Sequence, residues 1–288
     1  MVSHVSALPL YPFDSRSCLM RQSAIASLLS LALILSLLPL VALAASEQPS
    51  VKTPPQPKSA LFIGNSFTYY NNSLHMHVLK IAKSVSRQKG QTNREKTFYT
   101  KAMTISGGYL KDHALGAKGM IQDFTDGKKP GPWDVVVVQG YSRGPLTKET
   151  APSFRSNGRK IDSWIRDAGS QTVLFMTWAY QGRPEMTAPL VKAYTDLGNE
   201  LGALVAPVGL AFENARIANP AMNLYAPDKK HPSLLGTYLA ANVFFATLFG
   251  ESPVGSSYTA GLSDKQAAFA QSVAWHTVQQ YFGDKPDA

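Results

Sequence analysis

Short apolar runs alternate with segments of helical periodicity over most of the chain. The plainest run is Asp134–Val138, where four consecutive valines follow the aspartate, as expected of a strand buried on both faces. Four more runs end at glycine or at polar residues and are also predicted to be strands: Leu61–Ile63, Thr97–Ile105, Thr172–Met176 and Leu204–Val208. We therefore expect five strands.

Between and after these runs, apolar residues recur every three or four positions, which predicts helices with one buried face. The predicted helices are Leu74–Val85, Arg159–Ala168, Thr187–Leu201 and Asp264–Phe282. Ser233–Phe249 is apolar nearly all round, so we expect a helix packed deeply on the sheet. Strands that alternate with helices indicate an α/β fold, with a parallel sheet covered by helices on both faces in one domain.

The beginning of the chain has a different pattern. Arg21 precedes an apolar run over residues 24–43, and the exit Ala42-Leu43-Ala44 has the small residues of a signal-peptidase site. We therefore interpret residues 1–45 as a signal peptide with upstream residues, and an uncleaved membrane anchor is the alternative. The protein is expected to be exported, either to the periplasm or out of the cell, with no membrane span after cleavage.

The rest of the chain divides into a tether and a domain. Residues 46–57 are rich in proline and have no periodicity, so they are interpreted as a tether, and 58–288 as the folded domain. The only cysteine, Cys18, lies in the predicted signal peptide, so the mature chain would have no disulfide and no thiol nucleophile. The net charge of +9 suits anionic envelope polymers or a merely basic surface, and nucleic acid is not expected as a partner.

Polar residues follow the first three predicted strands, and in a parallel sheet these strand ends share one edge. Ser66 follows the first strand, Gly107 the second and Gln139 the third. Late in the chain, Asp228 and His231 are three residues apart, a spacing at which the carboxylate can reach the imidazole in a turn. Serine, histidine and aspartate can act as nucleophile, base and orienting group in acyl transfer.

Two of these residues are candidate donors to the oxyanion of an acyl-transfer reaction. Gly107 is either a plain turn glycine or a residue whose backbone N–H faces the oxyanion with no side chain in the way. Gln139 either caps its strand or donates from its amide to the same oxygen.

Four sequence blocks occur in the order seen in the SGNH hydrolases, the GDSL-like esterases and lipases. They are Gly64-Asn65-Ser66-Phe67, Ser106-Gly107-Gly108, Val138-Gln139-Gly140 and Asp228-Lys229-Lys230-His231-Pro232-Ser233. Over about residues 59–250 the chain resembles a bacterial branch of this family. The resemblance implies a flavodoxin-like three-layer sandwich with a five-stranded parallel sheet and a Ser66–His231–Asp228 triad. It also implies an oxyanion hole built from the backbone N–H groups of Ser66 and Gly107.

The sequence departs from the family pattern at two positions. Asn65 stands where an aspartate usually precedes the nucleophile. The third block of the family supplies an asparagine side chain to the oxyanion hole, and this chain has Gln139-Gly140-Tyr141-Ser142 there. We assign that role to Gln139, although an ungapped match places Tyr141 at the position.

These observations predict an exported serine esterase that hydrolyses an acyl ester, on a small molecule, a carbohydrate or an envelope polymer. The alternative is a non-catalytic carbohydrate-binding module on the same fold. No cofactor and no metal are expected, because His75 and His77 point in different directions on a helix and no acidic or cysteine cluster lies near them. Trp178, Tyr180 and Arg183 are candidates for a sugar-binding rim, with a place in the core as the alternative for Trp178.

Overall fold

The computed structural model of the chain describes residues 48–122 and 132–283. The predicted signal peptide, residues 1–45, lies outside the described residues. Among the helices of the described residues, none is both long enough and apolar enough to cross a membrane.

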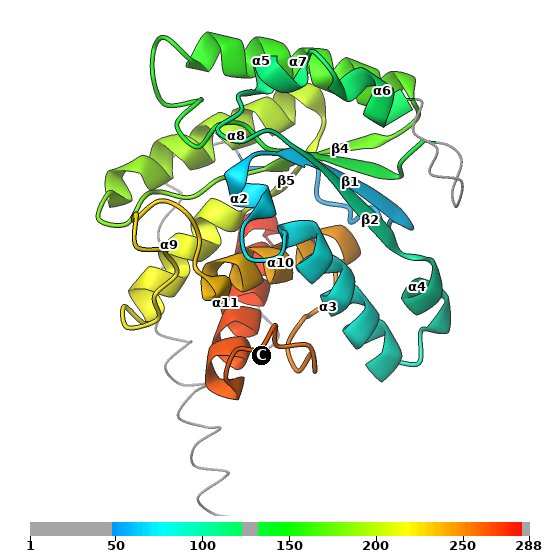
Figure 1. Ribbon diagram of the computed structural model, residues 1–288, viewed down its shortest axis with the longest axis vertical. Helices are drawn as coiled ribbons and strands as arrows, with labels where there is room; N and C mark the ends of the chain where they lie inside the picture. The colour runs from blue at the N-terminus through cyan, green and yellow to red at the C-terminus, as the bar shows by residue number, and fades with distance from the viewer. Residues whose placement is uncertain (1–47, 123–131, 284–288) are drawn as a thin grey trace, which may run out of the picture. The chain divides into compact units, whose positions relative to one another are not determined.

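A parallel five-stranded sheet organises the described residues (Figure 1). In spatial order its strands are β2 (Tyr99–Thr104), β1 (Ser59–Gly64), β3 (Val135–Val138), β4 (Gln171–Phe175) and β5 (Leu204–Ala206). The register places Val138 opposite Ile63 on one side and Leu174 on the other. The order 2-1-3-4-5 is that of flavodoxin-like sheets, so the predicted fold class is confirmed.

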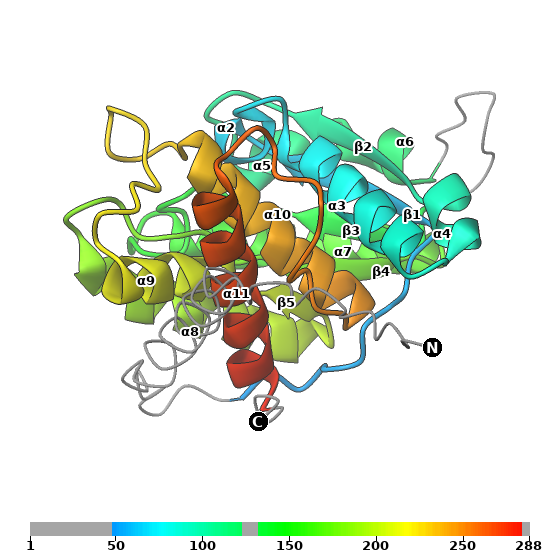
Figure 2. The same cartoon turned by 90° about the horizontal axis from the view of Figure 1, so that it is seen from below.

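Helices cover both faces of this sheet (Figure 1). One face carries α5 (Leu110–His113), α6 (Ala117–Gln122), α7 (Ala151–Asp167) and α8 (Thr187–Leu201). The other carries α3 (Leu74–Gln88), α4 (Thr92–Thr97), α9 (Val208–Ala218), α10 (Leu234–Phe249) and α11 (Asp264–Phe282). In Figure 2, α11 lies across α10 on this second face.

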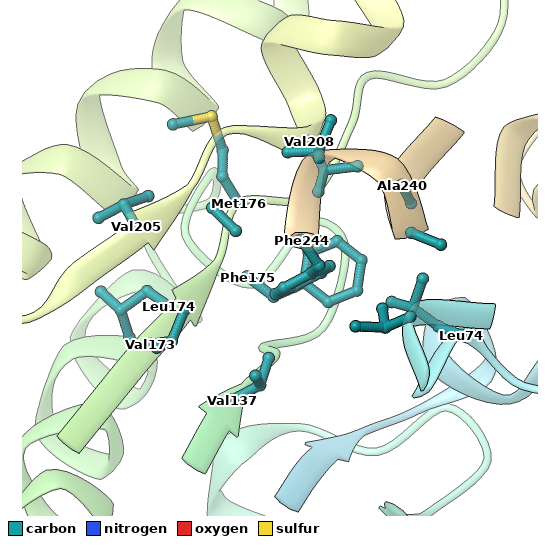
Figure 3. Close-up of a cluster of buried hydrophobic side chains, with 14 of the residues drawn as sticks. Leu74, Val137, Val173, Leu174, Phe175, Met176, Val205, Val208, Ala240 and Phe244 are labelled. Carbon is teal, nitrogen blue, oxygen red and sulfur yellow. The ribbon is translucent and has the colours of Figure 1, made fainter. Parts of the chain in front are cut away.

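The central helix of the second face is α10, which is buried from Leu235 to Phe249. Its Phe244 ring packs edge-on against Phe62 of β1 and Phe175 of β4, with centroids 5.3 and 5.0 Å away (Figure 3). A helix that is apolar all round needs partners on every side, and α3, α9 and α11 supply them. The prediction of a deeply packed helix is confirmed.

Several element boundaries differ from the predicted ones, and proline accounts for two of them. β5 ends at Ala206 because Pro207 has no N–H for the sheet, and α9 begins directly after it. α7 begins at Ala151, well before the predicted start, with Pro152 in its first turn. The short elements α2 (Ser66–Tyr69), α4, α5, α6 and η1 (Pro184–Met186) have too few turns to produce a periodic pattern.

The Pro-rich segment was predicted to be a tether, and its described part, residues 48–57, contains no helix or strand. This part nevertheless packs along the domain (Figure 2). The backbone N–H of Ser50 donates to Asn199 Oδ1 (2.7 Å), and that of Gln56 donates to the Leu248 carbonyl (3.0 Å). Pro54 lies directly against Gly250, where a Cβ atom would come within 2.6 Å of it. Residues 48–57 are therefore held against the domain by hydrogen bonds and packing, although they form no helix or strand.

Candidate active site

Ser66 lies at the point where β1, an inner strand of the sheet, passes into α2. Asn65 caps this short helix, because its Oδ1 accepts the backbone N–H of Phe67 (3.1 Å). Gly64 permits the sharp passage, since a Cβ there would meet Thr68 Oγ1 at 2.3 Å. Ser66 is therefore the first residue of α2, at the carboxyl edge of the sheet, where the sequence predicted it.

The structure brings Ser66, His231 and Asp228 together, although 165 residues separate the serine from the histidine. Ser66 Oγ lies 2.8 Å from His231 Nε2, and the other ring nitrogen, Nδ1, is bonded to Asp228 Oδ2. Asp228 Oδ1 accepts the backbone N–H groups of Lys230 and His231, each at 3.0 Å. The chain reverses tightly here, with Lys229 at φ +64°.

These contacts define the proton positions of the His231 ring. Asp228 is ionised and can only accept, so Nδ1 carries the proton and Nε2 is free to accept from the serine hydroxyl. Burial alone would raise the pKa of Asp228, but the hydrogen bonds from the His231 ring and from the two backbone N–H groups lower it to about 2. The carboxylate therefore holds the ring in the orientation that a base at Nε2 requires.

Two aromatic rings fix the plane of the His231 imidazole. Tyr70 stacks on its face, with centroids 4.2 Å apart and 3° between the planes, and Phe67 meets it edge-on at 5.8 Å. Phe67 in turn stacks on Trp178 at 4.1 Å. Trp178 is fully buried, so the prediction of a core position holds for it and the prediction of a sugar-binding rim does not.

Besides the contact between Ser66 and His231, Asn71 links the segment that follows Ser66 to the loop that carries His231. Its Nδ2 donates to the Pro232 carbonyl (2.9 Å) and to Thr237 Oγ1 (2.8 Å). Its own carbonyl accepts from His77 Nε2 (2.6 Å). Pro232 is the residue after His231, so Asn71 sets the position of the histidine backbone relative to the segment that carries Ser66.

The two predicted backbone donors, the N–H groups of Ser66 and Gly107, belong to residues of the pocket wall. Gly107 lies at the third position of a tight turn closed by a bond from the Gly108 N–H to the Ile105 carbonyl, with φ +64° at Gly107. Both Ser66 and Gly107 line the pocket at the site. Among the described residues, no hydrogen-bond acceptor is bonded to either backbone N–H. The sequence predicted these two groups as oxyanion donors, and the structure places both at the pocket.

Gln139, the third predicted oxyanion donor, is placed differently. Its side chain is fully buried and does not line the pocket. Its Oε1 accepts from the Asn65 N–H (3.0 Å) and the Thr68 hydroxyl (2.8 Å), and its Nε2 donates to Asn65 Oδ1 (2.7 Å) and the Gly140 carbonyl (2.8 Å). With both amide atoms engaged behind the site, the side chain has no N–H left for an oxyanion. Tyr141, the alternative at this block, does line the pocket.

The pocket around Ser66 has a volume of about 330 Å³. Its walls are formed by Asn65, Ser66, Phe67, Tyr69, Tyr70, Ser106, Gly107, Tyr141, Ser142, Tyr180, Lys230 and His231. Sequence reasoning named Tyr180 for a rim but missed Tyr69 and Tyr70. The position of these two tyrosines, three and four residues after Ser66, could have indicated that they lie near the site.

The two histidines of α3 serve the structure around the site. Both ring nitrogens of His77 are bonded, Nε2 to Asn71 and Nδ1 to the Tyr258 hydroxyl (2.8 Å). His75 Nδ1 is bonded to Ser73 Oγ (2.7 Å). Across residues 48–122 and 132–283, no three His, Cys, Asp or Glu side chains gather as metal ligands would.

No protein-family model and no curated protein matches the chain. Among solved structures, the chain is similar to a candidate SGNH hydrolase from Slackia heliotrinireducens, at 25% identity and TM-score 0.51, over 66% of this chain and 98% of that one. It is also similar to a DUF4886 family protein from Bacteroides uniformis, at 19% identity and TM-score 0.53, over 80% of this chain and 96% of the other. A catalytic mutant of an acetylxylan esterase from Geobacillus stearothermophilus shares 15% identity and TM-score 0.50, over 69% and 97%. The chain therefore has the fold of the SGNH hydrolases, and its structural neighbours include esterases.

Proposed function

We propose that this chain is an exported serine esterase in which Ser66 is the nucleophile, His231 the base and Asp228 its orienting group. The observation that carries the proposal is the 2.8 Å contact between Ser66 Oγ and His231 Nε2 at the wall of a pocket. Asp228 on the opposite ring nitrogen completes the set that acyl transfer needs. The fold, shared with esterases, supports the same reaction class.

In the first half of the proposed reaction, Ser66 Oγ attacks the carbonyl carbon of the ester while its proton moves to His231 Nε2. The carbonyl oxygen becomes an oxyanion, which accepts hydrogen bonds from the N–H groups of Ser66 and Gly107. The bond to the alcohol oxygen then breaks, and the imidazolium gives its proton to that oxygen. The products of this half are a free alcohol and an acyl group on Ser66.

In the second half, a water molecule attacks the acyl carbon and gives its proton to His231 Nε2. The same two N–H groups hold the new oxyanion. Collapse breaks the bond to Ser66 Oγ, which takes the proton back from the histidine, and the carboxylic acid leaves. Asp228 stays ionised throughout and stabilises the imidazolium that forms in each half.

We further propose that the alcohol part of the ester is a saccharide. Four tyrosines line the pocket: Tyr69, Tyr70, Tyr141 and Tyr180. A tyrosine offers a flat apolar ring and a hydroxyl at its edge, which suits a molecule with apolar faces and many hydroxyl groups.

The proposal that the protein is exported rests on the sequence of residues 1–45. Mass spectrometry of the exported protein tests it, since a retained 24–44 segment would mean an anchored protein.

A serine-reactive fluorophosphonate tests the nucleophile directly. We expect it to label Ser66 and to leave Ser106 and Ser142, the other serines of the pocket, unlabelled. Ser66→Ala and His231→Ala should each remove nearly all hydrolysis of p-nitrophenyl acetate, and the double variant should lose little more, because the two residues act as a unit. Labelling at another serine would refute the assignment.

The non-catalytic carbohydrate-binding module remains the second candidate function. One observation favours it: the Gln139 amide is engaged behind the pocket, so the side-chain donor expected of the third block is absent from that residue. A module of this kind would bind saccharide, would not react with the fluorophosphonate and would not cleave p-nitrophenyl acetate.

A further inference from the structure

Tyr180 interacts with two positive charges, Lys230 at the pocket wall and Arg143 outside the lining residues. Lys230 lines the pocket, and its Nζ is 5.6 Å from the centroid of the Tyr180 ring. The Tyr180 hydroxyl is bonded to Ser142 Oγ (2.7 Å), and Arg143 is the next residue along the chain. Burial raises the pKa of the Tyr180 phenol, and the nearby charge of Arg143 partly offsets that rise.

Neither cation is neutralised within the described residues. The other described arginines all form ion pairs with carboxylates: Arg87, Arg94, Arg155, Arg159, Arg166, Arg183 and Arg216. In residues 48–122 and 132–283, no carboxylate pairs with Arg143 or Lys230. Arg143 is thus exceptional among the described arginines, whereas Lys230 resembles most of the described lysines, of which Lys89 and Lys192 form ion pairs.

The pocket walls also lack negative charge, since none of the lining side chains has a carboxyl group. Asp228 is close in sequence to Lys230, but its oxygens are committed to the His231 ring and to two backbone N–H groups. Lys230, Arg143 and the ionised Asp228 together carry a net charge of +1, so an anion beside Tyr180 meets a net positive charge.

The position of Lys230 is well defined at its backbone. Its N–H donates to Asp228 Oδ1 (3.0 Å), and its carbonyl accepts from the buried Trp178 Nε1 (3.0 Å). The side chain thus starts from a fixed point next to His231, at the wall of the pocket.

From these observations we infer that the alcohol part of the ester carries an anionic oxygen group, such as a carboxylate, which binds at Lys230 and Arg143 beside Tyr180. The substrate class is then an acylated acidic saccharide. This inference rests on the proposed esterase function and adds the charge of the substrate. Tyrosine rings hold the saccharide, the two cations hold its anion, and the acyl group reaches Ser66.

Two polymers that differ in whether their carboxyl groups are charged or methylated test the inference. O-acetylated polygalacturonate is compared with the same polymer after methyl esterification of its carboxyl groups, and kcat/KM is measured by acetate release. We expect the charged polymer to be preferred about tenfold or more at 50 mM NaCl, with the preference shrinking at 500 mM because salt screens exposed charges.

Single variants test whether Lys230 and Arg143 cause the preference for the charged polymer. Lys230→Met and Arg143→Met should each lower the ratio of the two kcat/KM values about three- to tenfold, as expected for contacts with an exposed charge. The control is Lys265→Met, which removes an exposed lysine at the start of α11 and should leave the ratio unchanged. A wild-type ratio near one, with acetate released from both polymers, overturns the inference and leaves the esterase proposal standing.

A binding measurement separates the two proposals when no turnover occurs. Ser66→Ala protein is titrated with an unacetylated oligogalacturonide in a calorimeter, at low and at high salt. Salt-sensitive binding that weakens in Ser66→Ala/Lys230→Met supports the anion site, and absence of binding overturns it. If binding is present but neither polymer nor p-nitrophenyl acetate is cleaved, the esterase proposal fails and the protein is a binding module for acidic saccharide.

Discussion

Asn71→Asp tests how far the position of His231 depends on the segment that carries the nucleophile. The substitution keeps the shape of the side chain but replaces the NH₂ group with an oxygen. It removes both hydrogen bonds that Asn71 donates and places an oxygen opposite the Pro232 carbonyl, 2.9 Å from the position of the former donor. Two oxygens without a hydrogen between them repel, so the histidine loop is expected to move away from Ser66.

The magnitude follows from the contact with the Pro232 carbonyl, because the Thr237 hydroxyl can turn and donate to the new carboxylate. A neutral hydrogen bond contributes about 1 kcal/mol net, and an oxygen facing an oxygen adds a further cost, so the loss of stability should be about 2–3 kcal/mol. In a domain of this size that corresponds to a fall in Tm of about 5–10 °C. If the loop that carries His231 shifts by a few tenths of an ångström, the 2.8 Å contact between Ser66 Oγ and His231 Nε2 becomes longer. Turnover should therefore fall about tenfold or more, with KM little changed.

Aspartate is a better probe than alanine because the backbone here is unusual. Asn71, Asn72 and Ser73 have φ values of 52°, 66° and 69°, three left-handed residues in a row. Asparagine and aspartate tolerate this region, whereas alanine would add strain of about 1–2 kcal/mol and obscure the effect of the lost bonds.

The matched control is Asn72→Asp. Asn72 has the same residue type and the same left-handed backbone, is exposed, and among the described residues its side chain has no hydrogen-bond partner. It adds the same charge one residue away and should change stability by less than about 0.5 kcal/mol. Thermal unfolding and p-nitrophenyl acetate turnover, measured well below Tm, give the comparison. Equal losses of turnover in the two variants would show that Asn71 does not position His231.

Three further outcomes follow from the structure. Gln139→Ala should destabilise the fold by about 3–5 kcal/mol in urea unfolding, because it leaves two buried donors unpaired; a loss of turnover with full stability would instead support the oxyanion role predicted from sequence. Gly107→Ala should cost about 1–2 kcal/mol and reduce turnover, since the space around it is open but its φ of +64° is left-handed, so the turn is expected to shift its N–H; turnover that stays unchanged despite the lost stability would show that the reaction does not depend on the conformation of this turn. Burial, with a smaller contribution from His77, lowers the pKa of His75 to about 4, below the 6.5 of the unfolded chain. The unfolded state then binds more protons, so Tm should fall as pH drops from about 6.5 towards 4, and His75→Gln should reduce that slope.

The parts of the site that sequence could predict are those set by local geometry or by sheet topology. Asp228 and His231 are three residues apart, so a single turn decides their contact. Ser66 reaches His231 across the chain because a parallel sheet gathers the ends of its strands along one edge. The strand at Val135–Val138 was predictable from its sequence pattern, since four consecutive valines are typical of a strand that is covered on both faces.

The parts that sequence could not predict depend on which way a side chain turns or on packing between distant segments. Residues 48–57 have no periodic pattern, and only their hydrogen bonds to Asn199 and Leu248 show that they lie along the domain. The link from Asn71 to Pro232 is of the same kind, because an asparagine in a turn gives no sign of the distant carbonyl it will meet.

Gln139 and Asn65, the two departures from the family pattern, are hydrogen-bonded to each other. Gln139 Nε2 donates to Asn65 Oδ1, while Asn65 Nδ2 donates to the Gly108 carbonyl. An aspartate at 65 could accept the first bond but could not donate the second, so the Asn65 amide ties the turn before Ser66 to the turn at Gly107-Gly108. Gln139 follows β3, and its side chain is buried against Asn65, away from the pocket. The hydrogen bonds of Gln139 would also be possible with an aspartate at 65, so the asparagine accounts for the link to Gly108 alone. In the proposed reaction the oxyanion is held by the backbone N–H groups of Ser66 and Gly107.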